Sequence, residues 1–366
     1  MENISLNKSL LVALQFFAFS VQAYWSGGVA LGAHLQALNV AAVFTAVQVA
    51  SLLAFGLLAD RVAPKQLLVI SAGLFSIGAV ALFGGTLPWI VAGQALSGAA
   101  AGSMVVIFAA ANRHTADDDR SYAMRRLVGF VWFGIGFGQI VGHAVLERFG
   151  LTGFAATSLV GAMVIVVVVA KLPDLPRPPR MIPESIRARF SPAFGLTLVI
   201  SFLAAASGSV LQTRVPFLFE ENSSVLTFLI CVAAGGGVWV SRRRRFQQRN
   251  ESGILSASLA VIGIGFLVPT STDNPWAIGS AFFLIGMMIA IGDACFQSII
   301  GIVSRPSSTA MSIGIFLTVA TGGKLVATLL AKSPSSFAAA AFISFIAAFL
   351  AILLYTRVET HIRPNN

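Results

Sequence analysis

The chain has 366 residues, of which 57% are hydrophobic and only 10% are charged, and its mean hydropathy is +0.86. A soluble domain carries about 25% charged residues, so this composition excludes an ordinary water-soluble fold. The net charge of +10 does not indicate nucleic-acid binding, because the basic residues lie at the ends of apolar runs, where membrane proteins carry their orientation signals.

Long apolar runs recur along the whole chain, and each approaches the roughly 20 residues that a helix needs to cross a bilayer. A transmembrane β-barrel would instead show segments of about 10 alternating residues. We therefore predict an all-α membrane protein with twelve transmembrane helices. The predicted spans cover residues 9–31, 38–58, 66–86, 88–111, 127–146, 151–171, 194–216, 224–240, 253–271, 276–303, 307–330 and 335–356.

The basic residues of the loops provide a test of this count. With twelve spans, 20 of the 24 lysines and arginines fall on the side that holds Lys8, three fall on the other side, and Lys324 lies within a span. Loops rich in lysine and arginine stay in the cytoplasm. The sequence therefore predicts a multi-pass protein of the cytoplasmic (inner) membrane with both termini in the cytoplasm.

The longest polar stretch, residues 173–192, is rich in proline and arginine. Dense proline favours an extended linker over a helix. This linker divides the chain into an N-terminal half, residues 1–172, and a C-terminal half, residues 193–366, with six predicted spans each. Two such halves joined by a cytoplasmic linker are typical of transporters that rock about a central site.

The loop between the second and third spans reads GLLADRVAPK, from Gly56 to Lys65. It resembles the signature loop of the major facilitator superfamily, Gly-x-Leu-Ala-Asp-Arg-x-Gly-Arg-Lys, although alanine and proline replace the usual glycine and arginine. Gly56 permits close approach of two helices, and Asp60 can bind a helix N-terminus or a basic partner. We expect Gly56, Asp60, Arg61 and Lys65 to form a conformational-switch loop. The resemblance implies the major facilitator fold of two six-helix halves.

The fourth span contains VAGQALSG, from Val91 to Gly98. It looks like the superfamily's Arg-x-x-Gln-Gly motif, whose arginine is associated with proton coupling, but Gln94 stands at the arginine position. Two interpretations stay open. Either Gln94 donates hydrogen bonds in a cavity, or the segment serves helix packing around Gly93 and Gly98.

The fifth span contains GIGFGQIVGH, from Gly134 to His143. It resembles the glycine-rich motif of the superfamily's antiporters, Gly-x-x-x-Gly-Pro-x-x-Gly-Gly, with Gln139 in place of the proline. Glycines four residues apart make a smooth face for helix contact, and the resemblance also suggests export. His143 either titrates as a coupling residue or lies at the lipid interface beside Glu147 and Arg148.

Two charged residues, Asp293 in the tenth span and Lys324 in the eleventh, lie well inside apolar runs. Charges at such depth are costly and usually face a cavity or a partner. Gln297 lies four residues after Asp293 and therefore shares its helix face. Asp293 and Lys324 are interpreted either as part of a substrate or proton site, or as a structural ion pair that joins two helices.

The resemblance further implies that spans one, four, seven and ten line a central cavity. This placement brings Gln22, Gln94, Gln212 and Asp293 together as a mostly neutral polar lining. Trp25 either stacks on a substrate or belongs to the interfacial aromatic belt. The predicted substrate-binding residues are Gln22, Trp25, Gln94, Gln212, Asp293 and Gln297.

The sequence contains no nucleotide-binding loop and no set of residues typical of an enzyme active site or a metal centre. We therefore predict no enzyme activity, no cofactor and no metal. The function expected is secondary transport of a small organic molecule by alternating access, as proton-coupled efflux by a monomer in the bilayer. The alternatives are an uptake permease or facilitator for a small nutrient and, in a different class, a membrane scaffold without transport activity.

Overall fold

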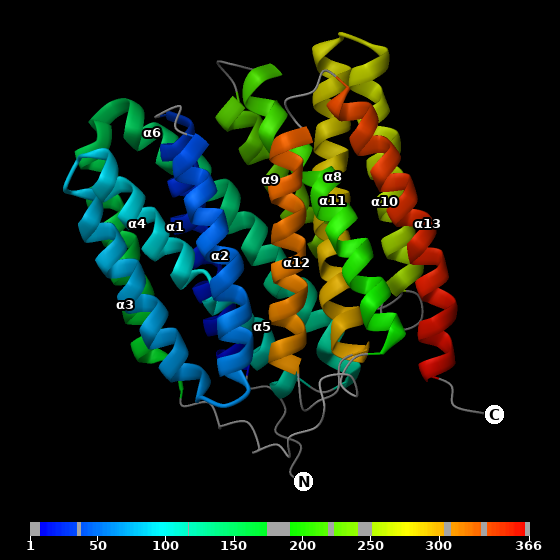
Figure 1. Cartoon of the computed structure of the whole chain (residues 1–366), viewed down its shortest axis with the longest axis horizontal. Helices are drawn as coiled ribbons and strands as arrows, with labels where there is room; N and C mark the ends of the chain where they lie inside the picture. The colour runs from blue at the N-terminus through cyan, green and yellow to red at the C-terminus, as the bar shows by residue number, and fades with distance from the viewer. Residues whose placement is uncertain are drawn as a thin grey trace. The chain divides into compact units, whose positions relative to one another are not determined.

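The computed structural model describes residues 8–34, 38–115, 117–173, 191–218, 223–240, 251–303, 309–330 and 335–362, which form helices and turns without any strand. This result confirms the all-α prediction, and every predicted span coincides with helix. The helices are α1 (Lys8–His34), α2 (Leu38–Ala59), α3 (Pro64–Leu82), α4 (Leu87–Ala100), α5 (Ser103–His114), α6 (Asp117–Lys171), α8 (Pro192–Leu218), α9 (Ser223–Val240), α10 (Glu251–Ser271), α11 (Pro275–Val303), α12 (Thr309–Leu330) and α13 (Ser336–Ile362) (Figure 1).

Within the described residues, eight helical segments are long and apolar enough to cross a membrane. One of them, Leu87–Arg113, joins α4 and α5 across a short break, so the predicted fourth span is divided. Another, Tyr122–Lys171, has 50 residues. At 1.5 Å per residue it is about 75 Å long, more than twice the roughly 30 Å of hydrocarbon in a bilayer. It therefore contains two spans, and the total of twelve stays a prediction of the sequence.

Two glycines with positive φ form the tight turns of the N-terminal half. Gly85, with φ of 68°, follows α3, and its N–H donates to the carbonyl of Leu82 at 3.2 Å. Gly150 has φ of 60° and ψ of −162° and divides α6 into two arms. Glycine adopts this backbone region without the steric cost that a side chain would add. These two positions therefore let the chain reverse direction within very few residues.

Large apolar side chains cover the outward faces of several helices. Ile77 of α3, Val160 of α6 and Phe342 of α13 are each about 60% exposed or more (59%, 60% and 67%). A water-soluble protein rarely leaves contiguous apolar surface of this kind uncovered, whereas lipid tails are themselves apolar. Trp89 and Trp276, in the first turns of α4 and α11, are also exposed, as expected for aromatic residues at a membrane interface.

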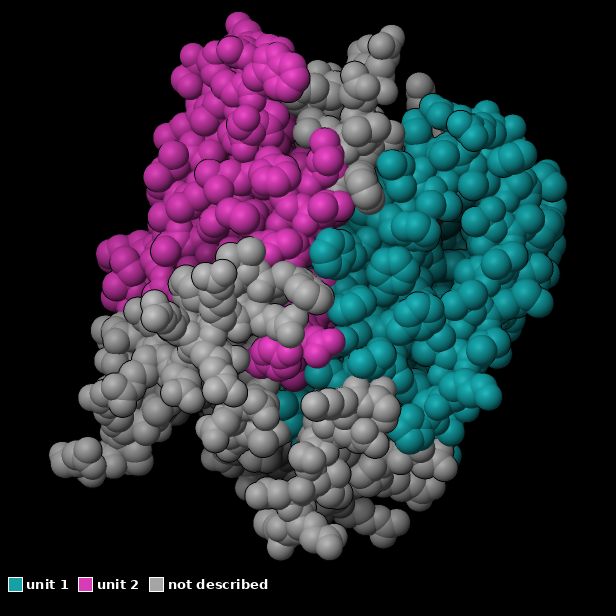
Figure 2. Space-filling model, turned by 180° about the vertical axis from the view of Figure 1, so that it is seen from behind, with its two compact units in different colours: residues 1–116, 130–180, 310–318 teal, residues 117–129, 181–309, 319–366 magenta. Residues whose placement is uncertain are grey.

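The chain packs into two compact units, shown in different colours in Figure 2. Unit 1 contains residues 1–116, 130–180 and 310–318, and unit 2 contains residues 117–129, 181–309 and 319–366. Each unit thus includes a short segment from the other sequence half. The division into residues 1–172, 173–192 and 193–366 stays a prediction about the architecture, and most of the predicted linker lies outside the described residues.

Glycines bring helices of unit 2 into close contact. A Cβ atom added to Gly323 of α12 would lie 2.4 Å from the carbonyl oxygen of Phe202 in α8, and one added to Gly208 of α8 would lie 3.2 Å from Cδ1 of Ile289 in α11. The α8–α12 contact depends on the missing side chain at Gly323, because a backbone carbonyl cannot rotate away as a side chain can. The contact lies directly beside Lys324.

We expect Gly323→Ala to lower the melting temperature of the purified protein, because overpacking costs about 1–3 kcal/mol. The adjacent Gly322 is a matched control, since a Cβ atom there would meet nothing within 4 Å. Gly322→Ala should leave the melting temperature unchanged or raise it, because alanine favours helix by about 1 kcal/mol over glycine. Equal melting temperatures for the two variants would contradict the close contact.

Candidate functional site

Asp60 of the predicted switch loop lies just after α2 and binds the N-terminus of α12. Its Oδ2 accepts a hydrogen bond from the N–H of Met311 at 3.1 Å, and the N–H of Ala310 also donates to this carboxylate. Its Oδ1 pairs with the guanidinium of Arg113, whose Nη1 donates to the carbonyl of Ala59 at 3.1 Å. The first N–H groups of a helix lack partners within that helix and carry positive partial charge. Asp60 therefore caps a helix that begins about 250 residues further along the chain.

Gly56 brings α2 against the same helix. A Cβ atom on Gly56 would lie 3.0 Å from Cα of Gly314, and one on Gly314 would lie 2.9 Å from Cα of Gly56. One turn further on, the hydroxyl of Thr318 donates to the carbonyl of Val49 at 3.4 Å. The contact extends along residues 310–318 of α12, all within unit 1. Gly56 and Asp60 thus act on one helix, the first by close packing and the second by charge.

The Asp60 carboxyl is partly buried, and burial raises its pKa above the ordinary value. The charge of Arg113 and the N–H groups of Met311 and Ala310 oppose this rise without cancelling it. An upward shift means that the folded protein binds the proton more tightly than the unfolded chain does. The contribution of Asp60 to stability is therefore full below the ordinary pKa of aspartate and declines as pH rises through the raised pKa.

The other two residues predicted for the loop have different surroundings. Arg61 is exposed, and its backbone N–H donates to the carbonyl of Leu58 at 2.8 Å, which forms the turn after α2. Lys65 is partly buried in the first turn of α3. The contact with α12 is made by Gly56 and Asp60, together with Arg113, which the sequence had indicated only as a loop charge.

Asp293 of α11 and Lys324 of α12 are both partly buried, and their charges interact. The side chain of Gln297, one turn after Asp293, is only 4% exposed. Its Oε1 accepts no hydrogen bond from the residues that the structure describes. Buried polar atoms are nearly always hydrogen-bonded to protein, water or ligand. This part of unit 2 therefore combines two charges with an acceptor that suits a donor from outside the protein.

The remaining predicted lining residues are placed in part. Gln22 of α1 is partly buried and packs against Gly134 of α6, and Gln94 of α4 is 5% exposed. Beside Gln94, Gly93 contacts the backbone of α3 at Gly78, and Gly98 contacts the backbone of α2 at Phe44. The helix-packing interpretation of this span is thus observed, while a substrate role for Gln94 stays a prediction. The side chains of Trp25 and Gln212 lie outside the described residues.

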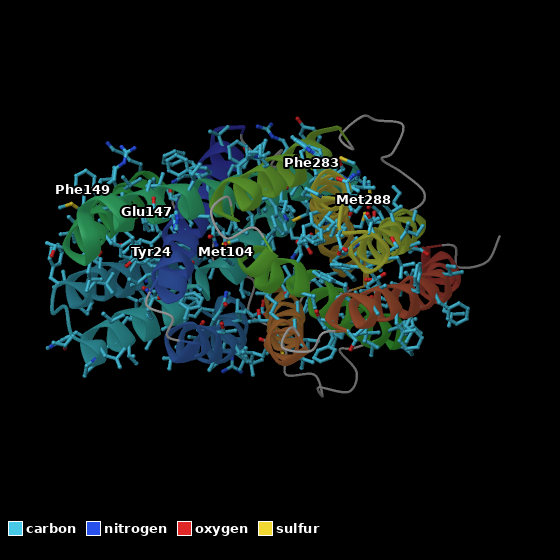
Figure 3. All side chains as sticks on the ribbon, turned by 90° about the horizontal axis from the view of Figure 1, so that it is seen from above. Tyr24, Met104, Glu147, Phe149, Phe283 and Met288 are labelled. Atoms are coloured by element: carbon cyan, nitrogen blue, oxygen red, sulfur yellow. The ribbon has the colours of Figure 1, made fainter. Side chains whose placement is uncertain are left out.

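His143 forms an ion pair of the i, i+4 type with Glu147, with Nε2 and Oε1 2.9 Å apart. The two side chains are 40% and 60% exposed. Glu147 lies close to Phe149 at the turn of α6, near the margin of unit 1 in Figure 3. This setting matches the interfacial interpretation of His143, and its role in coupling stays a prediction.

A buried ion pair that the sequence did not predict joins α6 to α10. Nη2 of Arg125 lies 2.8 Å from Oε1 of Glu251, and the two side chains are 1% and 13% exposed. We expected Arg125 in a cytoplasmic loop, but α6 begins at Asp117 and carries it inside helix. The sequence signal was present, because Met124, Leu127 and Val128 continue an apolar helical face past the arginine.

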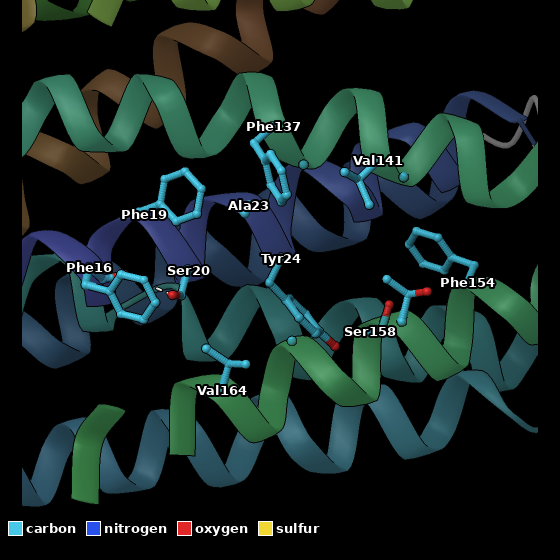
Figure 4. Close-up of a pocket in the computed structure, with 14 residues that line it drawn as sticks. Phe16, Phe19, Ser20, Ala23, Tyr24, Phe137, Val141, Phe154, Ser158 and Val164 are labelled. Atoms are coloured by element: carbon cyan, nitrogen blue, oxygen red, sulfur yellow. Dashed lines mark hydrogen bonds between the residues drawn. The ribbon is translucent and has the colours of Figure 1, made fainter. Parts of the chain in front are cut away.

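A cavity of about 210 Å³ lies in unit 1 between α1 and the two arms of α6 (Figure 4). Aromatic rings dominate its wall, and three glycines provide its space. The rings are those of Phe16, Phe19, Tyr24, Phe137 and Phe154, and the glycines are Gly138, Gly142 and Gly161. Two of these glycines belong to the motif of the predicted fifth span. That motif therefore opens a cavity in addition to packing α6 on α1 at Gly134.

The cavity is chemically apolar. Its hydroxyl groups donate to backbone carbonyls: Ser20 to Phe16 at 2.9 Å, Thr157 to Gly153 at 2.9 Å, and Tyr24 to Phe75 at 3.3 Å. No charged side chain is among the described residues that line it. Engineered apolar cavities of about 150 Å³ bind benzene. This cavity therefore has the size and lining for an aromatic ring or a comparable apolar group.

A family model described as Major Facilitator Superfamily matches residues 9–328. The chain belongs to the major facilitator superfamily. It is therefore a multi-pass membrane protein of a transporter family, and its fold is the major facilitator fold. The match includes the Asp60 loop, the α6 motif and the helices that carry Asp293 and Lys324.

Among curated proteins, the multidrug efflux pump LfrA of Mycolicibacterium smegmatis is 27% identical over 276 residues, which are 68% of this chain and 51% of that protein. The chain thus spans about half the length of this relative.

Solved structures show the same fold at low identity. The human organic anion transporter MFSD10 (TETRAN) has a TM-score of 0.77 at 13% identity, over 95% of this chain and 98% of that chain. A variant of the fucose:proton symporter FucP of E. coli has a TM-score of 0.73 at 13% identity, over 98% and 99% of the chains. A bacterial homologue of the iron transporter ferroportin, in an outward-facing state, has a TM-score of 0.70 at 15% identity, over 96% and 99%.

Proposed function

We propose that this member of the superfamily exports a small organic molecule in exchange for protons, by alternating access. The observation that carries the proposal is the interaction of Asp293 with Lys324 inside apolar helices. A carboxylate in such a setting can gain and lose a proton as its access and its partner change. Export is supported by the likeness to a multidrug efflux pump and by the glycine motif of α6.

Asp293 and Gln297 are proposed to contact the substrate and the proton together, because they share one face of α11. Gln22, Trp25, Gln94 and Gln212 are proposed as further contacts from other helices. The apolar cavity beside Tyr24 supports a substrate that carries an aromatic or other apolar group. These features favour a neutral or singly charged molecule over a multiply charged one.

Asp60 and Arg113 are proposed to act as a latch on α12. In the structure they hold the first turn of α12 within unit 1, and transport by alternating access would require this contact to form and break in each cycle. The charge pattern of the loops supports a cytoplasmic position for this latch and for both termini. We further propose that the protein works as a monomer in the cytoplasmic membrane.

The test is proton flux in proteoliposomes that contain a pH-sensitive dye. A panel of small organic molecules is added with an imposed pH gradient, and active compounds should release protons across the membrane. Asp293→Asn should abolish this flux while the melting temperature shows a folded protein. The matched control is Asp273→Asn, because Asp273 is exposed in the turn before α11.

Undiminished coupled flux in Asp293→Asn would remove Asp293 from the mechanism. Direction is tested separately in intact cells, where an exporter lowers the internal level of an active compound and an uptake permease raises it. Movement of the compound without protons in both variants would instead indicate a facilitator.

A further inference from the structure

The Arg125–Glu251 ion pair has the burial of a structural core contact although both residues are charged. The guanidinium of Arg125 is 1% exposed and lies 2.8 Å from the Glu251 carboxylate. Glu251 is the first residue of α10, where the positive end of the helix dipole favours a carboxylate. A buried charge that loses its partner is strongly destabilised. The two side chains can therefore separate only if both regain water or find new partners.

The pair holds a segment of α6 that belongs to the other sequence half. Residues 117–129 pack within unit 2, whereas residues 130–171 of the same helix pack within unit 1. The apolar side chains of Ala123, Met124 and Leu127 are also buried, each at 1% exposure or less. One charged contact and a short apolar face thus attach the beginning of α6 to unit 2. Such an attachment must be remade whenever α6 moves relative to α10.

Beneath this pair lies a cysteine. Cys295 of α11 is fully buried, its thiol hydrogen-bonds with Glu251, and the charge of Arg125 is close enough to act on it. The thiol reaches solvent only if the segment that carries Arg125 is displaced or α11 itself unfolds. Cys295 is therefore a natural reporter of whether the ion pair is closed.

We propose that Arg125 and Glu251 form a second gate, separate from the Asp60 latch, whose opening exposes Cys295 to modification by thiol reagents. The proposal rests on alternating access as the mode of transport, since a rigid protein would never open the pair. The Asp60 latch acts on α12 in unit 1, and this gate acts on α6 in unit 2. The two contacts use different residues and can be broken one at a time.

The test uses the rate at which N-ethylmaleimide labels Cys295, followed by mass spectrometry. The chain has two cysteines, so Cys231→Ala leaves Cys295 as its single thiol. In this background we expect slow labelling, and at least tenfold faster labelling after Glu251→Gln or Arg125→Met. The double variant Arg125→Glu with Glu251→Arg should return the rate toward that of the background, because the pair forms again with its charges exchanged.

Arg126→Met is the matched control, because the neighbouring Arg126 stacks its guanidinium on the ring of Tyr122, 5.7 Å from the centroid. Its labelling rate should stay within twofold of the background. Unchanged labelling in folded Glu251→Gln and Arg125→Met would overturn the proposal. If neither single variant folds, the exchanged pair decides alone, since fast labelling in that folded protein would also overturn it. Labelling needs neither substrate nor protons, so a failure of the proposed transport activity would be recognised separately.

Discussion

Asp60→Ala is expected to release the first turn of α12, with a clear loss of thermal stability and a strong fall in transport. The substitution leaves the N–H groups of Ala310 and Met311 and the guanidinium of Arg113 without their shared acceptor. Removing one partner of a largely buried ion pair costs about 3 kcal/mol, and the Asp60 side chain is 15% exposed. The measurements are the melting temperature of the purified protein and flux in proteoliposomes.

Two controls separate the charge from the cap. Asp60→Asn keeps an oxygen that can accept from the helix N-terminus but loses the attraction to Arg113, so its melting temperature should fall between those of the other two proteins. Arg61→Ala changes an exposed neighbour in the same turn and should behave as wild type. If Asp60→Ala matched Arg61→Ala in both measurements, the loop would have no latching role.

Lys324→Met is expected to destabilise the protein more than Lys324→Met combined with Asp293→Asn. The single change leaves the charge of Asp293 between apolar helices without the lysine that attracts it, at a cost of about 3 kcal/mol. The double change removes both charges and therefore most of that cost. Residues in contact show coupling energies of roughly 0.5–3 kcal/mol in such a cycle. The four melting temperatures give the coupling directly.

The same cycle separates a structural pair from a transport site. A purely structural pair would let the double variant recover proton-coupled flux along with its stability. We expect recovery of stability without recovery of flux, because neither remaining side chain can carry a proton. Additive melting temperatures would show that Asp293 and Lys324 do not act on each other.

The helices could be predicted from the sequence nearly to the residue, because each depends on a local property. An apolar run such as 276–303 needs only its own length and composition to be recognised, and the structure places α11 at Pro275–Val303. The start of α6 was predicted about ten residues too late, near residue 127 instead of Asp117. Helical hydrogen bonds continue past the apolar run when the charged residues beyond it find partners, as Arg125 does in Glu251.

The candidate sites could be predicted only in part, because their partners are far apart in the sequence. Asp60 was expected to bind a helix N-terminus or a basic residue, and the structure supplies both, from α12 and from Arg113. The cavity beside Tyr24 was not expected, since it forms only where α1 meets both arms of α6. Its glycines were interpreted as packing residues, and the spacing alone does not show which of them face a helix and which face a space.

By itself the sequence determined the membrane class, the positions of the helices and the family, because apolar length, loop charge and the Asp60 loop are all properties of short segments. Only the tertiary structure decided which charges meet. Arg113 and Arg125 looked alike as basic residues near the membrane surface, yet the first binds Asp60 and the second is buried against Glu251. A charge at the end of a helix is stable in water or in a pair, and the choice depends on which other helix packs beside it.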